Sequence, residues 1–354
     1  MKFIHVTDLH IMGRTPKYRK DDFLQTILEK IEWVQKYAED IEATAILCTG
    51  DLFDRADTAY SVLNDVIPVM RRSKVPWVSV IGNHDEYGYN PDTILRTPMG
   101  TLMRQGIVTH VGYNYKSYDC YANDTDIVVI TGCDSTIQTD NREDKEYDYG
   151  VYSGEEIIFP LDPEDMNKKI TTIHLSHGFL ANKNWGDKIH HTQINEIYDK
   201  VEADIVLAGH EHSGFGIVKT PNGKLFVNGG ALGRITAGVG DINREVMISE
   251  ITVENGVYDA KLVPVAIARD VDEVMDLELA RKEKERIEIL NNFTESANEI
   301  QVEEADDMNV FEYIDVIRNE LFCNTDLPAT TITNIVNRAK EAIQKAHENV
   351  GGRL

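Results

Sequence analysis

The sequence predicts an α/β fold built on a parallel sheet, and two observations predict it. Short apolar runs at 2–7, 43–48 and 75–81 have the length and composition of buried strands. Between them, residues 23–38 and 58–72 place apolar side chains at helical spacing. A strand–helix–strand unit brings its second strand back parallel to the first through a right-handed crossover. The order of these segments therefore predicts parallel strands covered by helices.

Further strands and hairpins are predicted between residues 127 and 264. Apolar runs at 127–130, 170–175 and 204–208 predict three more strands. Residues 134–168 are polar and acidic, which indicates an insertion or a long loop. Hairpin-like segments, some joined by glycine-containing turns, follow at 216–219, 224–228, 246–253 and 257–264.

The chain divides into a larger α/β domain, residues 1–265, and a helical C-terminal region, residues 266–354. The β pattern stops near the boundary, and residues 271–291 have the composition of a charge-rich helix. Residues 295–307 are acidic and predict a linker. Helices with an apolar stripe follow this linker. They could pack on the core or dock a partner's helix pair, and the linker favours docking.

Composition limits the possible functions of the chain. The net charge is −24, which argues against broad attraction to nucleic acid or to an anionic membrane. A nuclease remains compatible with this charge, because divalent ions and a local basic patch can hold phosphate. Apolar runs fall short of the roughly 20 residues of a membrane helix. The absence of a signal-like start and of CxxC pairs among the four cysteines is typical of a cytoplasmic protein.

Polar residues follow five of the predicted strands at their carboxyl ends. In layered α/β folds these ends meet at the edge where ligand sites are built, so we expect the side chains to lie together. Turn-forming residues and packed histidines are the structural alternative, which does not predict the shared strand-end position. The eight residues are Asp8, His10, Asp51, Asn83, His84, His177, His210 and His212.

This set of side chains predicts a two-metal centre. Mixed oxygen and imidazole ligands suit divalent first-row ions, and the absence of cysteine argues against structural zinc. The candidates are too many for one ion, and two ions about 3.5–4 Å apart need a bridging carboxylate. Asp51 is the natural bridge, and His84 can then act on the leaving oxygen. We expect two divalent ions, with manganese as the leading candidate and iron, zinc or magnesium as alternatives.

The motifs that contain these residues resemble the calcineurin-like metallophosphoesterases. In order, they are Asp8-x-His10, Gly50-Asp51-x-x-Asp54, Gly82-Asn83-His84-Asp85, His177 and Gly209-His210-x-His212. The resemblance spans residues 1–215 and implies a two-metal phosphoesterase on a four-layer α/β/β/α sandwich, here with a small C-terminal helical region.

The resemblance also implies a role for each residue. One metal would be held by Asp8, His10, Asp51 and His212. The other would be held by Asp51, Asn83, His177 and His210. His84 would be the proton donor or transition-state contact, oriented by Asp54. From the residues alone, Asp54 could instead begin a helix.

Three features are similar to the SbcD-type nuclease subunits of DNA double-strand-break repair, including phage-encoded versions. They are the run 50–54, the run 209–212 with the glycine-rich segment 228–232, and the helical C-terminal region. One turn differs, since that family often has Gly-Ser-Pro where this chain has Gly230-Ala231-Leu232. The resemblance implies a DNA exo/endonuclease, a homodimer, and an SMC-like SbcC-type ATPase docked on the C-terminal helices. Its place would be the cytoplasm, associated with the nucleoid.

A basic loop lies just past the first predicted metal ligands. Its cations are Arg14, Lys17, Arg19 and Lys20. A solvated loop is the default reading, and a contact to the DNA backbone is the alternative, which the location beside the metal ligands supports. Among the other histidines a structural role is the default. Only His190 and His191, in a loop after His177, have a location that suits substrate contact.

Two rival functions remain open at this stage. A small-molecule or phosphoprotein phosphoesterase would use the same centre on another substrate. A mainly structural, partner-binding subunit would use the C-terminal helices instead. The intact ligand set argues against this second rival.

Overall fold

The computed structural model describes residues 1–112, 118–151, 167–186, 188–287, 333 and 336–337. The chain forms two compact units, Met1–Leu277 and Glu278–Leu354. The candidate site lies entirely within the first. The predicted linker 295–307 and residues 152–166 of the predicted insertion lie outside the described residues, as do nearly all residues of the helices expected after the linker. The domain boundary expected at residue 265 stays a prediction.

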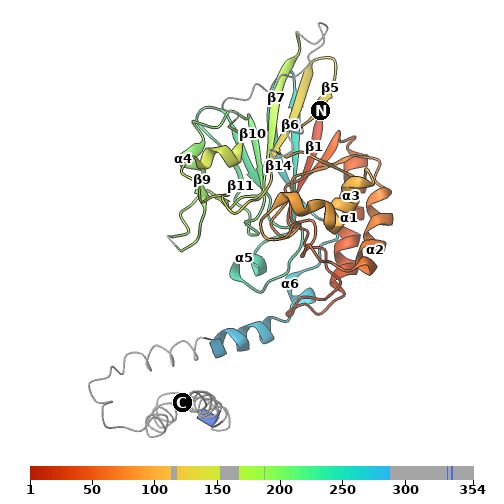
Figure 1. The fold of residues 1–354 in the computed structure, drawn as a ribbon, viewed down its shortest axis with the longest axis vertical. Helices are drawn as coiled ribbons and strands as arrows, with labels where there is room; N and C mark the ends of the chain where they lie inside the picture. Colours follow the sequence, from red (N-terminus) through yellow and green to blue (C-terminus); the bar gives the residue numbers. More distant parts are fainter. Residues whose placement is uncertain (113–117, 152–166, 187, 288–332, 334–335, 338–354) are drawn as a thin grey trace, which may run out of the picture. The chain divides into compact units, whose positions relative to one another are not determined.

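The first sheet contains the parallel strands that the sequence predicts (Figure 1). Its order is β14-β13-β1-β2-β3-β4, and β1 to β4 run parallel while β13 and β14 are antiparallel. Helices α1, α2 and α3 connect or follow the parallel strands. The bounds are β1 Lys2–Val6, α1 Phe23–Asp40, β2 Ala45–Cys48, α2 Tyr60–Arg71, β3 Trp77–Ser79, η1 Pro91–Arg96, α3 Pro98–Arg104, β4 Val108–His110, β13 Met247–Glu254 and β14 Val257–Pro264.

The second sheet has the order β11-β12-β10-β7-β6-β5, with parallel strands inside and antiparallel strands at both edges. A short two-stranded sheet, β8 and β9, projects beside it. The bounds are β5 Asp119–Ala122, β6 Asp126–Cys133, η3 Lys145–Tyr149, β7 Lys169–Ser176, β8 Leu180–Ala181, β9 Thr192–Gln193, α4 Ile194–Ile197, β10 Ile205–Ala208, β11 Gly216–Lys219, β12 Leu225–Asn228 and α5 Val239–Ile242.

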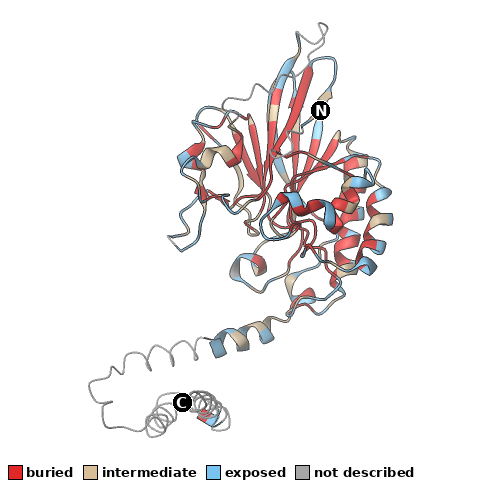
Figure 2. Cartoon of the chain, in the orientation of Figure 1, coloured by how far each residue is buried: buried red, intermediate tan, exposed pale blue. Residues whose placement is uncertain are grey.

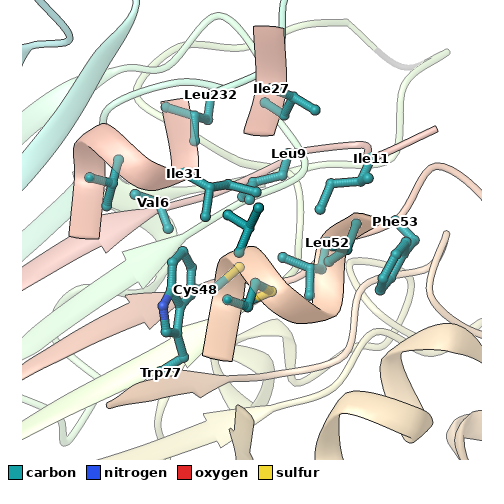
Figure 3. Close-up of a cluster of buried hydrophobic side chains, with 14 of the residues drawn as sticks. Val6, Leu9, Ile11, Ile27, Ile31, Cys48, Leu52, Phe53, Trp77 and Leu232 are labelled. Carbon is teal, nitrogen blue, oxygen red and sulfur yellow. The ribbon is translucent and has the colours of Figure 1, made fainter. Parts of the chain in front are cut away.

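Alternate residues of β1 face different cores, as the two-residue period of a strand requires. Phe3 packs with residues of both sheets, such as Leu47 and Ile173, so this core lies between the sheets. Ile4 packs instead with side chains from α1 and α2. Figure 3 shows part of that helix-side core, where Ile31 lies close to Cys48 and Trp77.

A third core covers the far face of the second sheet. It contains Val206 and Phe226 from the sheet, Ile194 and Ile197 from α4, and Tyr149 from η3. The order of layers is therefore helices, sheet, sheet and a thin helical layer, and the strands are buried throughout the centre (Figure 2). This is the predicted α/β/β/α sandwich, and that prediction is confirmed.

The helix predicted over 271–291 is interrupted. Helix α6, Val271–Val274, ends where Met275 adopts an extended backbone conformation. Both Val274 and Met275 are buried, and the Lys20 amide donates to the Val274 carbonyl. Helical residues resume at 277 and continue to 287, the last described residue of the predicted span. Backbone pairing of Val274 and Met275 with the basic loop, including a bridge between Arg19 and Met275, accompanies the break, which the charge pattern could not predict.

Among the residues that the structure describes, no helix is long and apolar enough to span a membrane.

Candidate metal centre

The backbone at the strand ends is strained where the site is built. Asp8, His10, Asp51 and His210 all have positive φ angles, between 48° and 67°. L-residues adopt this conformation rarely, and it costs about 1–3 kcal/mol per residue. A Cβ on Gly82 would lie 2.1 Å from an Asp51 carboxylate oxygen, so glycine is required at this position of the loop after β3. The strained backbone at these four residues and the close contact between Gly82 and Asp51 are both found where the strand-end side chains lie together.

The first group of donors contains Asp8, His10 and His212. The Nε2 atoms of the two histidines are 3.1 Å apart. Oδ1 of Asp8 lies 3.8 Å from Nε2 of His10 and 3.6 Å from Nε2 of His212. Ligands that share one ion at about 2.1 Å lie roughly 3–4 Å from each other, depending on the angle between them at the ion, so this spacing fits a bound divalent ion.

The second group contains Asn83, His177 and His210. Nδ1 of His177 is 2.6 Å from the Thr49 carbonyl oxygen, which can only accept, so Nδ1 bears the proton. Nε2 of His177 then points at Oδ1 of Asn83, 3.0 Å away. The His210 ring lies beside it, with ring centres 5.2 Å apart. Once Nε2 of His177 gives up its proton in exchange for a bound metal, its lone pair and the amide oxygen of Asn83 converge in a way that suits a cation between them.

Asp51 lies between the two groups. Its Oδ2 is 3.6 Å from Nε2 of His10 and 3.2 Å from Nε2 of His177. Its Oδ1 accepts from the His84 amide at 2.9 Å. This position suits a carboxylate shared by two ions, the role that the sequence predicts for it.

The electrostatics of this pair also favour cations. Burial alone would raise the pKa of Asp51, but the nearby histidines, His177 first and then His10 and His84, together hold that pKa well below its usual range. Burial alone would lower the pKa of His177, yet the Asp51 carboxylate raises it to about 10. A buried carboxylate therefore calls for positive charge at this point, and divalent ions can supply it. The donor types and spacings fit two such ions.

His84 lies at the edge of the centre, and the residue is half-buried. Nδ1 donates to the main-chain carbonyl of Asp54 at 2.7 Å, which leaves Nε2 for a substrate atom. The Asp54 carboxylate faces Nδ1 of His10 at 3.7 Å and Arg14 at 3.5 Å instead. Asp54 thus contacts His84 through its backbone, while its side chain points to a candidate ligand.

Asp85 contributes to the site in a way that the sequence reasoning missed. Its buried carboxylate accepts from the amides of Leu52, Phe53 and Gly82 at 3.0–3.3 Å. These bonds join the loop after β2 to the loop after β3, so they hold Asp51 near His84. Burial, with Asp51 next, raises the pKa of Asp85 to about 7. The motif contained the residue, but a carboxylate that bonds amides and one that binds metal look alike in a sequence.

Glu86 gives a pH-dependent prediction. Both carboxylate oxygens are buried without a hydrogen-bond partner, and burial, then Asp134, raises its pKa from 4.5 to about 8. Between these values the folded state binds more protons than the unfolded state, so the free energy of unfolding falls as pH rises. For the metal-free protein, we expect Glu86→Gln to flatten this fall by roughly 0.5–1 kcal/mol per pH unit between pH 5 and 8.

Urea denaturation in EDTA at pH 5, 6.5 and 8 measures this effect. Glutamine has nearly the same shape and no titration, so the two proteins differ only in the ionisation of one group. Parallel stability curves for the two proteins would contradict the prediction.

The basic loop places its four cations in different surroundings. The Arg14 side chain is 73% exposed beside Asp54, and Lys17 is exposed with its ammonium over the Tyr18 ring. Nζ of Lys20 is exposed but donates to a main-chain carbonyl of α6. Arg19 is buried and forms a two-bond ion pair with Asp21. The burial of Arg19 points to a structural role, so any DNA contact of the loop would come from its exposed cations.

Comparison with known proteins places this geometry in a family. The profile of calcineurin-like phosphoesterases matches residues 1–214. The DNA double-strand break repair protein Mre11 of Methanosarcina mazei is 30% identical over 88 residues, which is 24% of this chain and 14% of that protein. The chain thus matches only a small part of that relative's length.

Solved structures with a similar fold include TT1561 of Thermus thermophilus, at 12% identity and a TM-score of 0.41, with 75% of this chain and 98% of that chain covered. A dimetal phosphatase from Danio rerio is 13% identical, with a TM-score of 0.46 and coverage of 75% and 96%. The family match covers more than half of the chain and contains every candidate ligand. The chain therefore belongs to the calcineurin-like phosphoesterases, a family of dinuclear-metal-dependent hydrolases.

Proposed function

We propose that this protein is a metal-dependent DNA nuclease, the nuclease subunit of an SbcCD-like repair or recombination complex. The observation on which the proposal rests is the pair of donor groups joined at Asp51, with the open Nε2 of His84 beside them. Such a pair suits in-line displacement at phosphorus. The partial likeness to a DNA repair protein supports DNA as the substrate.

The residues divide the chemical work among them. Asp8, His10, Asp51 and His212 would hold one ion, and Asp51, Asn83, His177 and His210 the other. Bound there, the ions supply Lewis-acid polarisation of the phosphodiester and activation of water. Thr49 fixes the tautomer of His177, and the Asp54 carbonyl fixes that of His84. Nε2 of His84, when protonated, can give its proton to the departing oxygen.

The first experiment is manganese-dependent cleavage of end-labelled linear duplex DNA, beside a small chromogenic phosphodiester. We expect cleavage of both, with the DNA activity lost in His84→Ala. Cleavage of the small ester alone would overturn the DNA substrate for the isolated chain and favour a small-molecule or phosphoprotein phosphoesterase. No hydrolysis of either would favour a partner-binding subunit.

Arg14 gives a prediction about DNA affinity. Its guanidinium is exposed and lies 3.5 Å from the Asp54 carboxylate, so it can reach a phosphate at the metal centre. We expect Arg14→Gln to weaken DNA binding about tenfold at low salt and to reduce the slope of log affinity against log salt by about 1. Fluorescence anisotropy with a labelled oligonucleotide measures both values.

Arg72→Gln is the matched control, because Arg72 is a similarly exposed arginine that pairs with Glu32 at the end of α2. Equal losses of DNA affinity in the two variants would mean that Arg14 acts only through the net charge of the protein. If the slope of log affinity against log salt were unchanged in Arg14→Gln, the proposed contact between Arg14 and a DNA phosphate would be contradicted.

The proposal includes two partners, an SMC-like ATPase and a second copy of this chain. A net charge of −24 predicts weak DNA binding by the isolated chain, which an SMC-like ATPase docked on the C-terminal helices would compensate. Homodimerisation follows from the SbcD resemblance. Light scattering of the full chain tests the dimer, and co-expression with an SbcC-type ATPase, with and without residues 308–354, tests the docking helices.

A further inference from the structure

A small aromatic group lies beside the second donor group, and the proposed chemistry does not use it. Phe179 follows His177 by two residues, and its ring meets the His210 ring edge-on with centres 5.8 Å apart. The centre of the Trp185 ring lies in turn 5.4 Å from the centre of the Phe179 ring. Nζ of Lys183 lies 4.6 Å from the centre of the Trp185 ring. We call Phe179, Trp185 and Lys183 the aromatic platform.

The base of the platform is held by a buried carboxylate. Asp140, from the acidic segment after β6, accepts from the Phe179 amide at 2.6 Å and from the Thr192 hydroxyl at 2.6 Å. The two strands at the base of the loop pair in the same place, Leu180 with Thr192. Asp140 itself is only 5% exposed and also accepts from the Tyr149 hydroxyl. The start and the end of the loop are therefore fixed to the sandwich.

The outer part of the loop is held by a histidine of defined tautomer. Nδ1 of His191 lies 2.7 Å from the Ile189 carbonyl, so it bears the proton. Nε2 then accepts from the Trp185 amide at 3.3 Å. Through these two bonds His191 connects the main chain at Trp185 with the main chain at Ile189. The indole is half-buried, so part of its surface stays accessible.

The chemistry of this group suits one kind of ligand. A partly exposed indole with a lysine over it, two ring-to-ring steps from a candidate metal ligand, offers stacking and positive charge together. Proteins that hold single strands combine aromatic stacking with cations in this way, and every base has a face that can stack. Lys183 and Lys188 are both exposed in a chain of strongly negative net charge. A loop with a purely structural role would need neither a partly exposed indole nor exposed lysines beside the metal centre.

We propose that the aromatic platform is a nucleobase subsite, on which an unstacked base of the substrate strand rests while its phosphodiester lies at the metal centre. The proposal rests on the proposed nuclease function and adds to it. A base can stack in this way only after it leaves the duplex, so the platform favours single-stranded or frayed ends. Asp140 is then the positioning residue that fixes the platform relative to His210.

The first test measures binding without turnover. In a Trp33→Phe background, Trp185 and the buried Trp77 are the remaining indoles, and only Trp185 is open to a ligand. In EDTA, we expect a thymidine 12-mer to quench the fluorescence saturably and an abasic 12-mer to have no effect. The same titration of Trp185→Phe in that background should be flat. Equal quenching by both strands, or none by either, would overturn the subsite.

The second test separates stacking from a purely structural role. With manganese, we expect Trp185→Ala to raise KM for the thymidine strand about tenfold. Its KM for the abasic strand should not change, and Trp185→Phe should restore most of the lost affinity. Tyr60→Ala, at an exposed tyrosine on α2, is the matched control. An equal rise in KM for both strands would make the loop structural.

The outcomes also separate this proposal from the nuclease function. Base-dependent quenching without strand cleavage would keep the subsite and overturn the nuclease, and would favour an esterase of free nucleotides. Strand cleavage without base-dependent quenching would keep the nuclease and overturn the subsite.

Discussion

Replacing Asp51 with asparagine is expected to remove hydrolysis of every phosphodiester that the protein accepts. One carboxylate oxygen lies within 3.6 Å of His10 and 3.2 Å of His177, so both donor groups share it. An amide is neutral and binds cations more weakly than a carboxylate. Loss of a residue that only supports a ligand costs 10–100-fold, so loss of this one should cost at least about 100-fold.

The measurement is the metal content after gel filtration, together with the rate on the small chromogenic diester. We expect about two manganese ions for each wild-type chain and at most one for Asp51→Asn. Asp57→Asn is the matched control, since Asp57 is an exposed carboxylate paired with Arg55. Two ions retained in Asp51→Asn would contradict the shared position of this carboxylate.

Much of the fold could be predicted because one face of each strand must be buried. The apolar runs predicted as strands at 43–48 and 204–208 match β2 and β10, in which every residue is buried. The segment predicted at 257–264 matches β14, whose side chains largely alternate between exposed and half-buried positions. The break at Met275 could not be predicted. It depends on backbone pairing with the basic loop, which is distant in sequence, whereas the local charge pattern favours an uninterrupted helix.

The candidate site could be predicted in outline because strands deliver their end residues to one edge. The structure brings together all eight strand-end residues from five strands. The sequence did not separate Asp85, which bonds three amides, from the carboxylates near His10 and His177. It also gave no reason to bury Arg19, whose guanidinium donates to the main-chain carbonyl of Arg234, a residue far away in the sequence. Local sequence reports residue type, whereas partner choice is a property of the tertiary structure.

His84→Ala is expected to lower kcat on DNA about 100- to 10,000-fold while the metal content stays the same. The ring contacts the Asp54 carbonyl through Nδ1, so its open nitrogen is Nε2, at the edge of the centre. A departing sugar oxygen needs a proton, because an alkoxide is a poor leaving group in water. A nitrophenolate leaves as a stable anion and needs no such help. The same substitution should therefore slow a nitrophenyl diester far less than DNA.

The ratio of the two losses distinguishes proton donation from other roles of His84. The His84 ring also lies 4.8 Å from the His10 ring, and its nitrogen is close enough to His10 and Asp51 to share an ion with them. If His84 were a metal ligand, His84→Ala would lower the metal content and slow both substrates alike. If it stabilised only the charge on phosphorus, both rates would fall equally with two ions retained. Only a large loss on DNA, a small loss on the activated ester and an unchanged metal content fit a proton donor.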